Sequence, residues 1–170
     1  TDKSQGSGVI ITEDGLVITN YHVIRDASQL SIVSYDKKVY AASLLGVEKL
    51  NDLAILKMSS KEQFHNLNFG DSDKVKIGEK IAAVGNPAGL GSTVTQGIIS
   101  QKDRKISGSI GLLQLDAPIN PGNSGGPVIN SAGKVVGILR SKIVGYESLG
   151  FAIPSNYAVS VAEEITQRDI

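Results

Sequence analysis

Short apolar runs separated by turn residues are the feature of this sequence that most limits its fold. The runs recur along nearly all of the 170 residues, with clusters of Gly, Asn, Asp and Ser between them. Such spacing is typical of antiparallel β-structure and does not fit the helical crossovers of a βαβ sheet. We therefore predict barrels rather than a parallel sheet. The expected strands lie near residues 7–12, 15–19, 29–34, 38–46, 53–58, 80–84, 93–100, 111–115, 127–130, 134–143 and 149–153.

One helix is expected, at the end of the chain. Ser155 follows Pro154 and is predicted to cap the helix. Apolar residues then recur at helical spacing, at Ala158, Val159, Ala162 and Ile165. The polar stretch from Ser59 to Lys80 is expected to connect the two groups of strands. His65 lies within this stretch and is predicted to be a solvated loop histidine without a functional role.

Composition excludes several classes of function. The chain has 17 Lys and Arg against 17 Asp and Glu, so no nucleic-acid or anionic-membrane footprint is expected. Cysteine is absent, which excludes a disulfide scaffold, a thiolate metal site and a cysteine nucleophile. His22 and His65 are the two histidines, so we expect no metal and no cofactor. No apolar run approaches the roughly 20 residues that cross a bilayer.

Ser124 lies within a segment that tolerates unusual backbone angles, Pro121-Gly122-Asn123-Ser124-Gly125-Gly126-Pro127. Glycines on both sides allow a sharp turn that exposes the hydroxyl and directs the amides of Gly122 and Ser124 at one point. A serine that attacks a carbonyl needs such preorganised N–H donors for the developing oxyanion. Taken alone, the segment also fits an ordinary Gly-rich hairpin loop.

Two further segments supply partners for a nucleophilic serine. His22 follows an apolar strand, and Asp52 precedes a continuous apolar run that predicts a buried strand. Singly, His22 also fits a structural histidine and Asp52 a turn cap. Together with Ser124 they occur in the order His, Asp, Ser, which is the order of chymotrypsin-type proteases and differs from those of subtilisins and α/β-hydrolases. The three residues are therefore predicted to be base, orienting acid and nucleophile.

Six segments in family order link the chain to a known family. They are Gly6–Ile11, Thr19–Ile24, Asn51–Leu56, Gly85–Pro87, Gly122–Gly126 and Gly150–Ser155. With these segments the chain resembles the protease domain of the HtrA/Deg family, a branch of the trypsin-like serine peptidases. The resemblance implies an all-β fold of two chymotrypsin-like antiparallel β-barrels with a C-terminal α-helix. It also implies one protease domain over residues 1–170, divided into a barrel (1–60), a connection (61–80), a second barrel (81–154) and the helix (155–170).

The same resemblance implies a serine endopeptidase that acts on unfolded or misfolded polypeptides in protein quality control and stress response. Gly122 and Ser124 would provide the oxyanion-hole amides, with Asn123 shaping the loop. The segment Lys102–Leu113 matches a region that takes part in activation, and by itself it predicts a mobile surface loop. The expected location is extracytoplasmic, in the bacterial periplasm or at the cell surface, or organellar.

Assembly is expected to differ from that of full-length family members. They usually carry PDZ domains after the protease, whereas this chain stops at Ile170 soon after the helix. Family trimers depend on an N-terminal segment, and here only Thr1–Gln5 precede Gly6. A homotrimer is therefore not the expectation for this fragment.

Specificity is predicted from the segments that would line the cleft. A preference for Lys or Arg commonly requires an acid six residues before the serine, where this chain has Pro118, and the nearest acid is Asp116. An apolar pocket leaves a lysine charge unpaired and accepts an aliphatic side chain. We therefore predict cleavage after Val, Ala or Leu. The expected substrate-binding residues are Pro118, Ile138, Leu139, Arg140 and Phe151, together with the loop Gly145–Phe151.

Two other functions fit parts of the sequence. A protease fold could serve as a catalytically silent module for chaperone-like binding or scaffolding, although the three catalytic residue types are all present. A secreted glutamyl-specific or exfoliative-toxin-like peptidase would need a basic group in its pocket, for which Arg140 or Lys142 is the candidate. Both of these side chains also fit solvent-facing strand positions.

Overall fold

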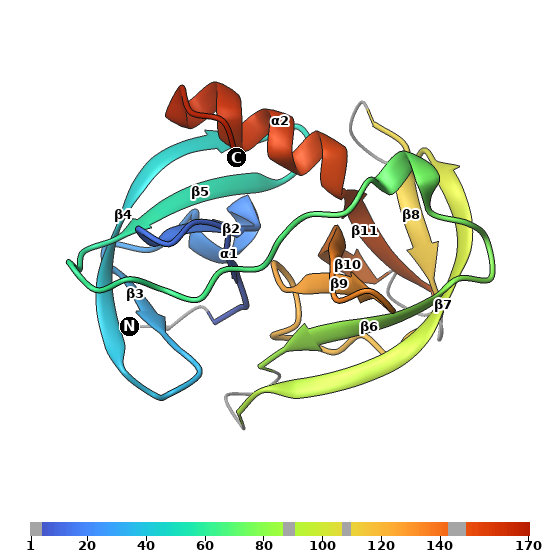
Figure 1. The fold of residues 1–170 in the computed structure, drawn as a ribbon, viewed down its shortest axis with the longest axis horizontal. Coiled ribbons are helices and arrows are strands. Elements are labelled where there is room, and N and C mark those ends of the chain that lie inside the picture. The colour runs from blue at the N-terminus through green and yellow to red at the C-terminus, as the bar shows by residue number, and fades with distance from the viewer. Residues whose placement is uncertain (1–4, 87–90, 107–109, 143–148) are drawn as a thin grey trace.

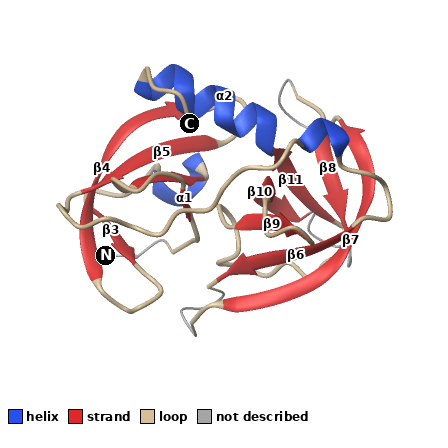
Figure 2. Ribbon diagram, viewed as in Figure 1, coloured by secondary structure: helices blue, strands red, loops and turns tan. Residues whose placement is uncertain are grey.

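The structure is a computed structural model that describes residues 5–86, 91–106, 110–142 and 149–170. Strands dominate both halves of the molecule, and a helix lies across the top of them (Figures 1 and 2). In the described part of the chain, no helix is long and apolar enough to span a membrane.

The first half is a five-stranded antiparallel sheet with the strand order β1-β2-β5-β4-β3. The central strand β5 is almost entirely buried, as its continuous apolar sequence predicts. The short helix α1 (Tyr21–Ile24) follows β2 directly. The strands are β1 (Val9–Ile10), β2 (Leu16–Thr19), β3 (Leu30–Val33), β4 (Val39–Glu48) and β5 (Leu53–Met58).

The second half is a closed six-stranded barrel with the order β10-β11-β8-β7-β6-β9. Its strands pair antiparallel throughout. A single 3-10 turn, η1 (Ser72–Lys74), lies in the connection that precedes the barrel. The strands are β6 (Lys80–Gly85), β7 (Thr93–Arg104), β8 (Leu112–Leu115), β9 (Pro127–Asn130), β10 (Val135–Lys142) and β11 (Gly150–Pro154).

One apolar cluster joins the two halves. It brings Ile18 and Ile55 of the sheet together with Ile138 of the barrel, and all three side chains are fully buried. The helix α2 (Ser155–Thr166) adds its buried face to the same cluster. Because the halves share buried apolar surface, their relative position is held by the same hydrophobic contribution that stabilises each half.

The expected all-β architecture with a C-terminal helix is confirmed, and every predicted strand has a counterpart within a few residues. The first half is a half-barrel sheet, in which β1 and β3 are the two edges among the described residues. β1 has two residues and β3 has four, so neither offers a long ladder for closure.

The predicted cap of the helix is wrong. Pro154 occupies the cap position with φ −57° and ψ 140°, and Ser155 is already the first helical residue. The Ser155 hydroxyl instead donates a 2.7 Å hydrogen bond to the carbonyl of Gly70. Ser155 therefore ties the start of α2 to the connection between the two halves.

The loop predicted from Lys102 begins later than expected. β7 continues to Arg104 because its end pairs with β8, with Arg104 opposite Leu112. Lys102 Nζ also donates to the carbonyl of Asp73 at 2.9 Å. Residues 107–109 of the predicted loop lie outside the described residues.

Candidate active site

Asp52 lies in the turn between β4 and β5, with its backbone in the left-handed region at φ +66°. Its carbonyl oxygen accepts hydrogen bonds from Asn20 Nδ2 at 3.0 Å and from Tyr21 N at 3.2 Å. These contacts join the Asp52 turn to the residues where β2 ends and α1 begins. The unusual backbone angle is therefore held by partners from a different strand.

The side chain of Asp52 is held against His22 by two hydrogen bonds. His22 N donates to Oδ1 at 2.8 Å, and His22 Nδ1 lies 2.6 Å from Oδ2. A carboxylate only accepts hydrogen bonds, so the proton of the neutral imidazole is on Nδ1. This tautomer leaves Nε2 with a lone pair that can accept a proton. The His22 side chain is 40% exposed and that of Asp52 is 13% exposed, so the base is accessible while its acid is largely shielded.

Ser7 holds the serine loop against the first half of the molecule. Its hydroxyl donates to the carbonyl of Gly122 at 2.6 Å and accepts from Asn86 N at 3.0 Å. Its amide donates to the carbonyl of Ser124 at 2.9 Å, and its own carbonyl accepts from Thr19 Oγ1 at 2.7 Å. One residue thus connects the serine loop, the end of β6 and the end of β2.

Gly125 allows the serine loop to approach the strand that leads to His22. Its φ is +88°, and a Cβ at this position would lie 2.2 Å from the Ser7 carbonyl and 2.5 Å from Thr19 Oγ1. It would also lie 3.1 Å from Asn20 N. Glycine is therefore required, and Ser124 lies beside the segment that carries His22.

The amides of the serine loop divide into two groups. Asn123 N donates to the Asn120 carbonyl at 3.1 Å, and Gly125 N donates to that of Leu139 at 2.8 Å. Within the described part of the chain, the amides of Gly122 and Ser124 donate to no acceptor. The two amides predicted for the oxyanion hole can therefore donate to a bound substrate. The backbone amide of Asn123 is used inside the loop. The side-chain Oδ1 of Asn123 is buried and has no hydrogen-bond partner among the described residues.

Ser124 and His22 come from opposite halves of the molecule. Among the residues that the structure describes, no hydrogen bond joins Ser124 Oγ to His22. Catalytic hydrogen bonds are often long in the absence of substrate and shorten when it binds. The approach of Gly125 to Thr19 and Asn20 brings the serine loop against the segment that leads to His22.

The predicted substrate-binding residues fall into different environments. Ile138 and Leu139 are fully buried and Phe151 is 4% exposed, so these side chains belong to the apolar cores. Pro118 is exposed, and its carbonyl accepts from Thr95 Oγ1 at 2.9 Å. Three of the five predicted side chains therefore offer almost no surface to a ligand. The predicted pocket loop falls largely on residues 143–148, which lie outside the described residues.

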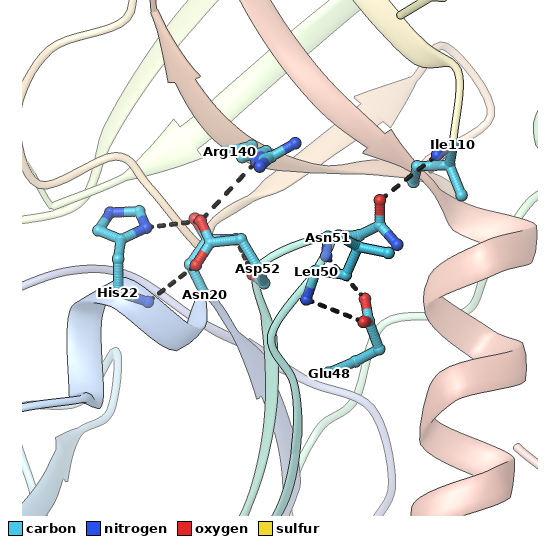
Figure 3. A network of polar contacts seen from close by, with 8 residues as sticks. All are labelled: Asn20, His22, Glu48, Leu50, Asn51, Asp52, Ile110 and Arg140. Atoms are coloured by element: carbon cyan, nitrogen blue, oxygen red, sulfur yellow. Dashed lines mark hydrogen bonds and ion pairs between the residues drawn. The ribbon is translucent and has the colours of Figure 1, made fainter. Parts of the chain in front are cut away.

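Arg140 is the fifth predicted residue, and it points at the Asp52 carboxylate. Its Nε lies 4.0 Å from Asp52 Oδ2, and its side chain is 14% exposed (Figure 3). The strand pattern alone had also allowed a solvent-facing position, which this burial excludes. The structure thus brings Arg140 to the candidate catalytic pair from the second barrel.

A second polar network lies next to Asp52 and was missed from the sequence (Figure 3). Asn51 is fully buried; its Nδ2 donates to Tyr157 OH at 2.8 Å, and its Oδ1 accepts from Ile110 N at 3.4 Å. Glu48 Oε2 accepts from Asn51 N at 2.9 Å and from Tyr157 OH at 3.1 Å. Burial, followed by the charge of Glu48, raises the pKa of Tyr157 above its ordinary value, so its hydroxyl remains a donor.

Sequence signals existed for only part of these missed residues. Ser7 lies in the Gly6–Ile11 segment that carried the family resemblance, but nothing in that segment indicated its partners. Tyr157 lies 106 residues from Asn51, and no local pattern predicts such a pair. Among the described residues, no group of three or more His, Asp or Glu side chains is arranged to hold a metal ion.

Comparison with known proteins gives consistent results. The family model for a trypsin-like peptidase domain matches residues 6–138. The serine protease Do-like HtrA of Bacillus subtilis (strain 168) is 44% identical over 99% of this chain and 40% of its own length. A probable periplasmic serine endoprotease, DegP-like, of Rhizobium meliloti (strain 1021) is 45% identical over 96% of this chain and 33% of its own length.

The solved structure of the HtrA-type protease AlgW with a decapeptide is also similar. It superposes with a TM-score of 0.91 at 36% identity, over 96% of this chain and 52% of that one. The chain thus spans between about a third and just over half of the length of these relatives. The family-model match, the HtrA- and DegP-type relatives and the common fold agree with the geometry of the site: the chain belongs to the trypsin-like peptidase domain family.

Proposed function

We propose that the chain is a serine endopeptidase domain, formed by residues 1–170 as one unit, that hydrolyses peptide bonds through an acyl-enzyme. The observation that carries the proposal is the 2.6 Å contact between His22 Nδ1 and Asp52 Oδ2, on a segment that packs against the serine loop. The contact keeps the imidazole proton on Nδ1 and leaves His22 Nε2 with a lone pair that can accept the serine proton. The names of the similar HtrA and DegP proteins support the same activity.

The residues account for each step of the reaction. Ser124 Oγ forms a bond to the carbonyl carbon while its proton passes to His22 Nε2, and the carbonyl oxygen becomes an oxyanion. The amides of Gly122 and Ser124 stabilise that oxyanion. The C–N bond then breaks, and the proton on Nε2 passes to the leaving amine. A water molecule repeats the sequence on the ester, which releases the acid and restores Ser124.

Asp52 contributes through His22 rather than by contact with the substrate. Its Oδ2 keeps the imidazole proton on Nδ1, and its negative charge stabilises the imidazolium that forms when Ser124 loses its proton. The two hydrogen bonds to the Asp52 backbone carbonyl hold the turn, and the bond from the His22 amide to Oδ1 orients the carboxylate. The carboxylate therefore needs little reorganisation during the reaction.

Unfolded polypeptides with small or medium aliphatic residues before the scissile bond are the proposed substrates. The decapeptide named with AlgW supports a peptide ligand for the fold. Pro118 occupies the position where a basic preference would need an acid. The nearest acid, Asp116, accepts from Ile98 N at 2.7 Å and is held by β7. Cleavage of a Val peptide should exceed that of the matched Arg peptide, and faster cleavage after Arg would contradict this preference.

The activity is tested by replacing the nucleophile. Ser124→Ala should reduce kcat for an unfolded protein substrate by a factor on the order of 10⁴, and it should abolish labelling by a fluorophosphonate. Ser131→Ala, in the exposed hairpin between β9 and β10, is the matched control, and it should keep the wild-type kcat and the fluorophosphonate labelling. Wild-type activity in the Ser124→Ala variant would refute the proposal.

A catalytically silent binding module is the second candidate. The observation that favours it is that Ser124 Oγ and His22 share no hydrogen bond among the described residues. A wild-type chain that binds unfolded protein but reacts with no fluorophosphonate would establish this alternative. Labelling of wild-type Ser124 would exclude it.

Location and assembly are proposed from the relatives. The similar DegP-like proteins are named as periplasmic, and we propose an extracytoplasmic location for this chain too. Fractionation of the source cells tests this directly. Light scattering of the purified chain tests the homotrimer that the resemblance implies, because it separates a monomer from a trimer.

A further inference from the structure

We propose that Arg140 is a positioning residue for the Asp52–His22 pair, and that its charge extends the activity of His22 as a base to lower pH. The inference rests on the proposed peptidase function and deepens it. It gives a specific role to a side chain that the sequence had placed among the substrate-binding residues.

The contact is one of two made by the same carboxylate oxygen. Asp52 Oδ2 lies 2.6 Å from His22 Nδ1 and 4.0 Å from Arg140 Nε, whereas Oδ1 accepts from the His22 amide. Figure 3 shows the contacts of His22 and Arg140 with Asp52, which reach the carboxylate from different elements. An imidazolium at His22 would therefore share its counterion with a second cation.

The local backbone explains how β10 delivers this side chain. In the pairing of β10 with β11, Leu139 lies opposite Ala152 and Ser141 opposite Phe151, so Arg140 is the additional residue of a register shift. A β-bulge of this kind redirects a side chain and is common beside active sites. The preceding residue, Leu139, exchanges hydrogen bonds with Gly125 and Gly126 at 2.8 Å each, which fixes β10 against the serine loop.

Burial strengthens the electrostatic effect of the contact. The Arg140 and Asp52 side chains are 14% and 13% exposed, so solvent screens their attraction less than it would on an open surface. A guanidinium stays charged throughout the pH range in which histidine titrates. Arg140 therefore balances the Asp52 carboxylate permanently, and protonation of His22 gains less from that carboxylate than it would without Arg140.

The other charges around His22 do not replace this effect. Directly after α1, the Arg25 guanidinium is paired with Asp26 at 3.1 Å, and both side chains are mostly exposed. Lys49 Nζ lies over the Tyr21 ring, 5.6 Å from its centroid. Among the described residues, Asp52 and Arg140 are the charged groups with a recorded contact that reaches the imidazole directly or through its partner.

The alternative role for Arg140 is recognition of an acidic substrate side chain, as in a glutamyl-specific peptidase. Its position argues against this role, because the guanidinium already faces a carboxylate and the side chain is mostly buried. A cation neutralised in this way contributes little to an additional anion. The two roles predict different results for the same variant.

The experiment measures the rate of labelling by a small fluorophosphonate across pH 5–9 in the full chain. In this reaction the serine oxygen bonds to phosphorus, fluoride leaves, and His22 accepts the serine proton. Arg140→Gln should move the acid limb of the rate profile upward by about 0.5 to 1 pH unit, equivalent to a ~3- to 10-fold loss of relative rate at the acid end. Arg140→Lys should keep the wild-type midpoint, because it retains the charge.

Arg168→Gln is the matched control, since it removes a guanidinium that bonds the Asp14 carboxylate outside the candidate active site. It should leave the profile unchanged. Arg140→Met places an unbranched apolar side chain at this largely buried position, and it replaces the Gln variant if that chain does not fold. An unshifted midpoint of the pH profile in a folded Arg140→Gln or Arg140→Met variant overturns the inference. A changed ratio of cleavage after Glu to cleavage after Ala, without a shift of that midpoint, overturns it too.

The same labelling experiment separates failure of the proposed peptidase activity from failure of the Arg140 inference. Absence of wild-type labelling, or labelling that survives Ser124→Ala, contradicts the proposed peptidase and with it the role of Arg140. Labelling that depends on Ser124 but shows no charge-dependent shift contradicts the Arg140 inference alone.

Discussion

Ser7 Oγ donates a 2.6 Å hydrogen bond to the carbonyl oxygen of Gly122, 115 residues further along the chain. The same hydroxyl accepts from the amide of Asn86, where β6 ends. The bond to Gly122 fixes the orientation of the peptide that precedes Asn123 and Ser124. A residue near the start of the chain thereby controls the shape of the candidate oxyanion hole.

Ser7→Ala should lower kcat/KM by roughly 10-fold and the free energy of unfolding by about 1 to 2 kcal/mol. The variant leaves the Gly122 carbonyl and the Asn86 amide without their partner while the loop sequence is unchanged. Peptidase kinetics and urea unfolding measure the two effects. Ser131→Ala provides the comparison, and equal kinetics in both variants would show that Ser7 does not shape the site.

Gly125→Ala should abolish activity, with a loss of at least about 100-fold. Its methyl group would collide with the Ser7 carbonyl, and its φ of +88° is unfavourable for alanine. Gly78→Ala is the matched control, because Gly78 has φ +84° with no atom within 4 Å of the added carbon. Both variants carry the backbone cost of about 1 kcal/mol, so an equal loss of activity in the two would exclude the steric explanation.

Tyr157→Phe should lower the free energy of unfolding by about 1 to 2 kcal/mol and reduce kcat several-fold. The change removes the acceptor of Asn51 Nδ2 and leaves that amide buried beside the Asp52 turn. Thermal or urea unfolding and steady-state kinetics provide the measurement. Tyr35→Phe, at a side chain that is 93% exposed, should change neither quantity.

Acid stability should depend on Asp14. Its hydrogen bond with the Arg168 guanidinium, followed by those with Thr12 and Lys57, holds the pKa of its carboxyl well below the ordinary 3.8. A lowered folded-state pKa adds stability that is present above about pH 4 and disappears as the pH falls through the folded value. Because Asp14 is 48% exposed, solvent screening limits the contribution to about 0.5 to 1 kcal/mol.

Asp14→Asn should therefore lower the free energy of unfolding at pH 7 by that amount, and the difference from wild type should narrow as the pH falls below 4. Urea unfolding at pH 7, 5 and 3 at low salt measures both. Asp169→Asn serves as the comparison at an exposed acid next to the last residue, Ile170. A difference that widens on acidification would show that the ion pair with Arg168 is not its source.

The sequence by itself determined the strands, the final helix and the candidate catalytic residues. Strand positions follow from apolar runs and turn residues that are local in the chain, which is why β5 was predicted with its observed bounds. His22, Asp52 and Ser124 could be named because their chemistry and order are properties of residue types alone.

Only the tertiary structure decided how those residues are held. The open edges of the first sheet, the Ser7 contacts and the Asn51–Tyr157 pair depend on segments that are distant in sequence and meet only after folding. Arg140 could be read as a substrate-binding or a solvent-facing residue until the register shift in β10 directed it to Asp52. Local propensity specifies which elements form, whereas the partner of each polar group depends on how the two halves pack.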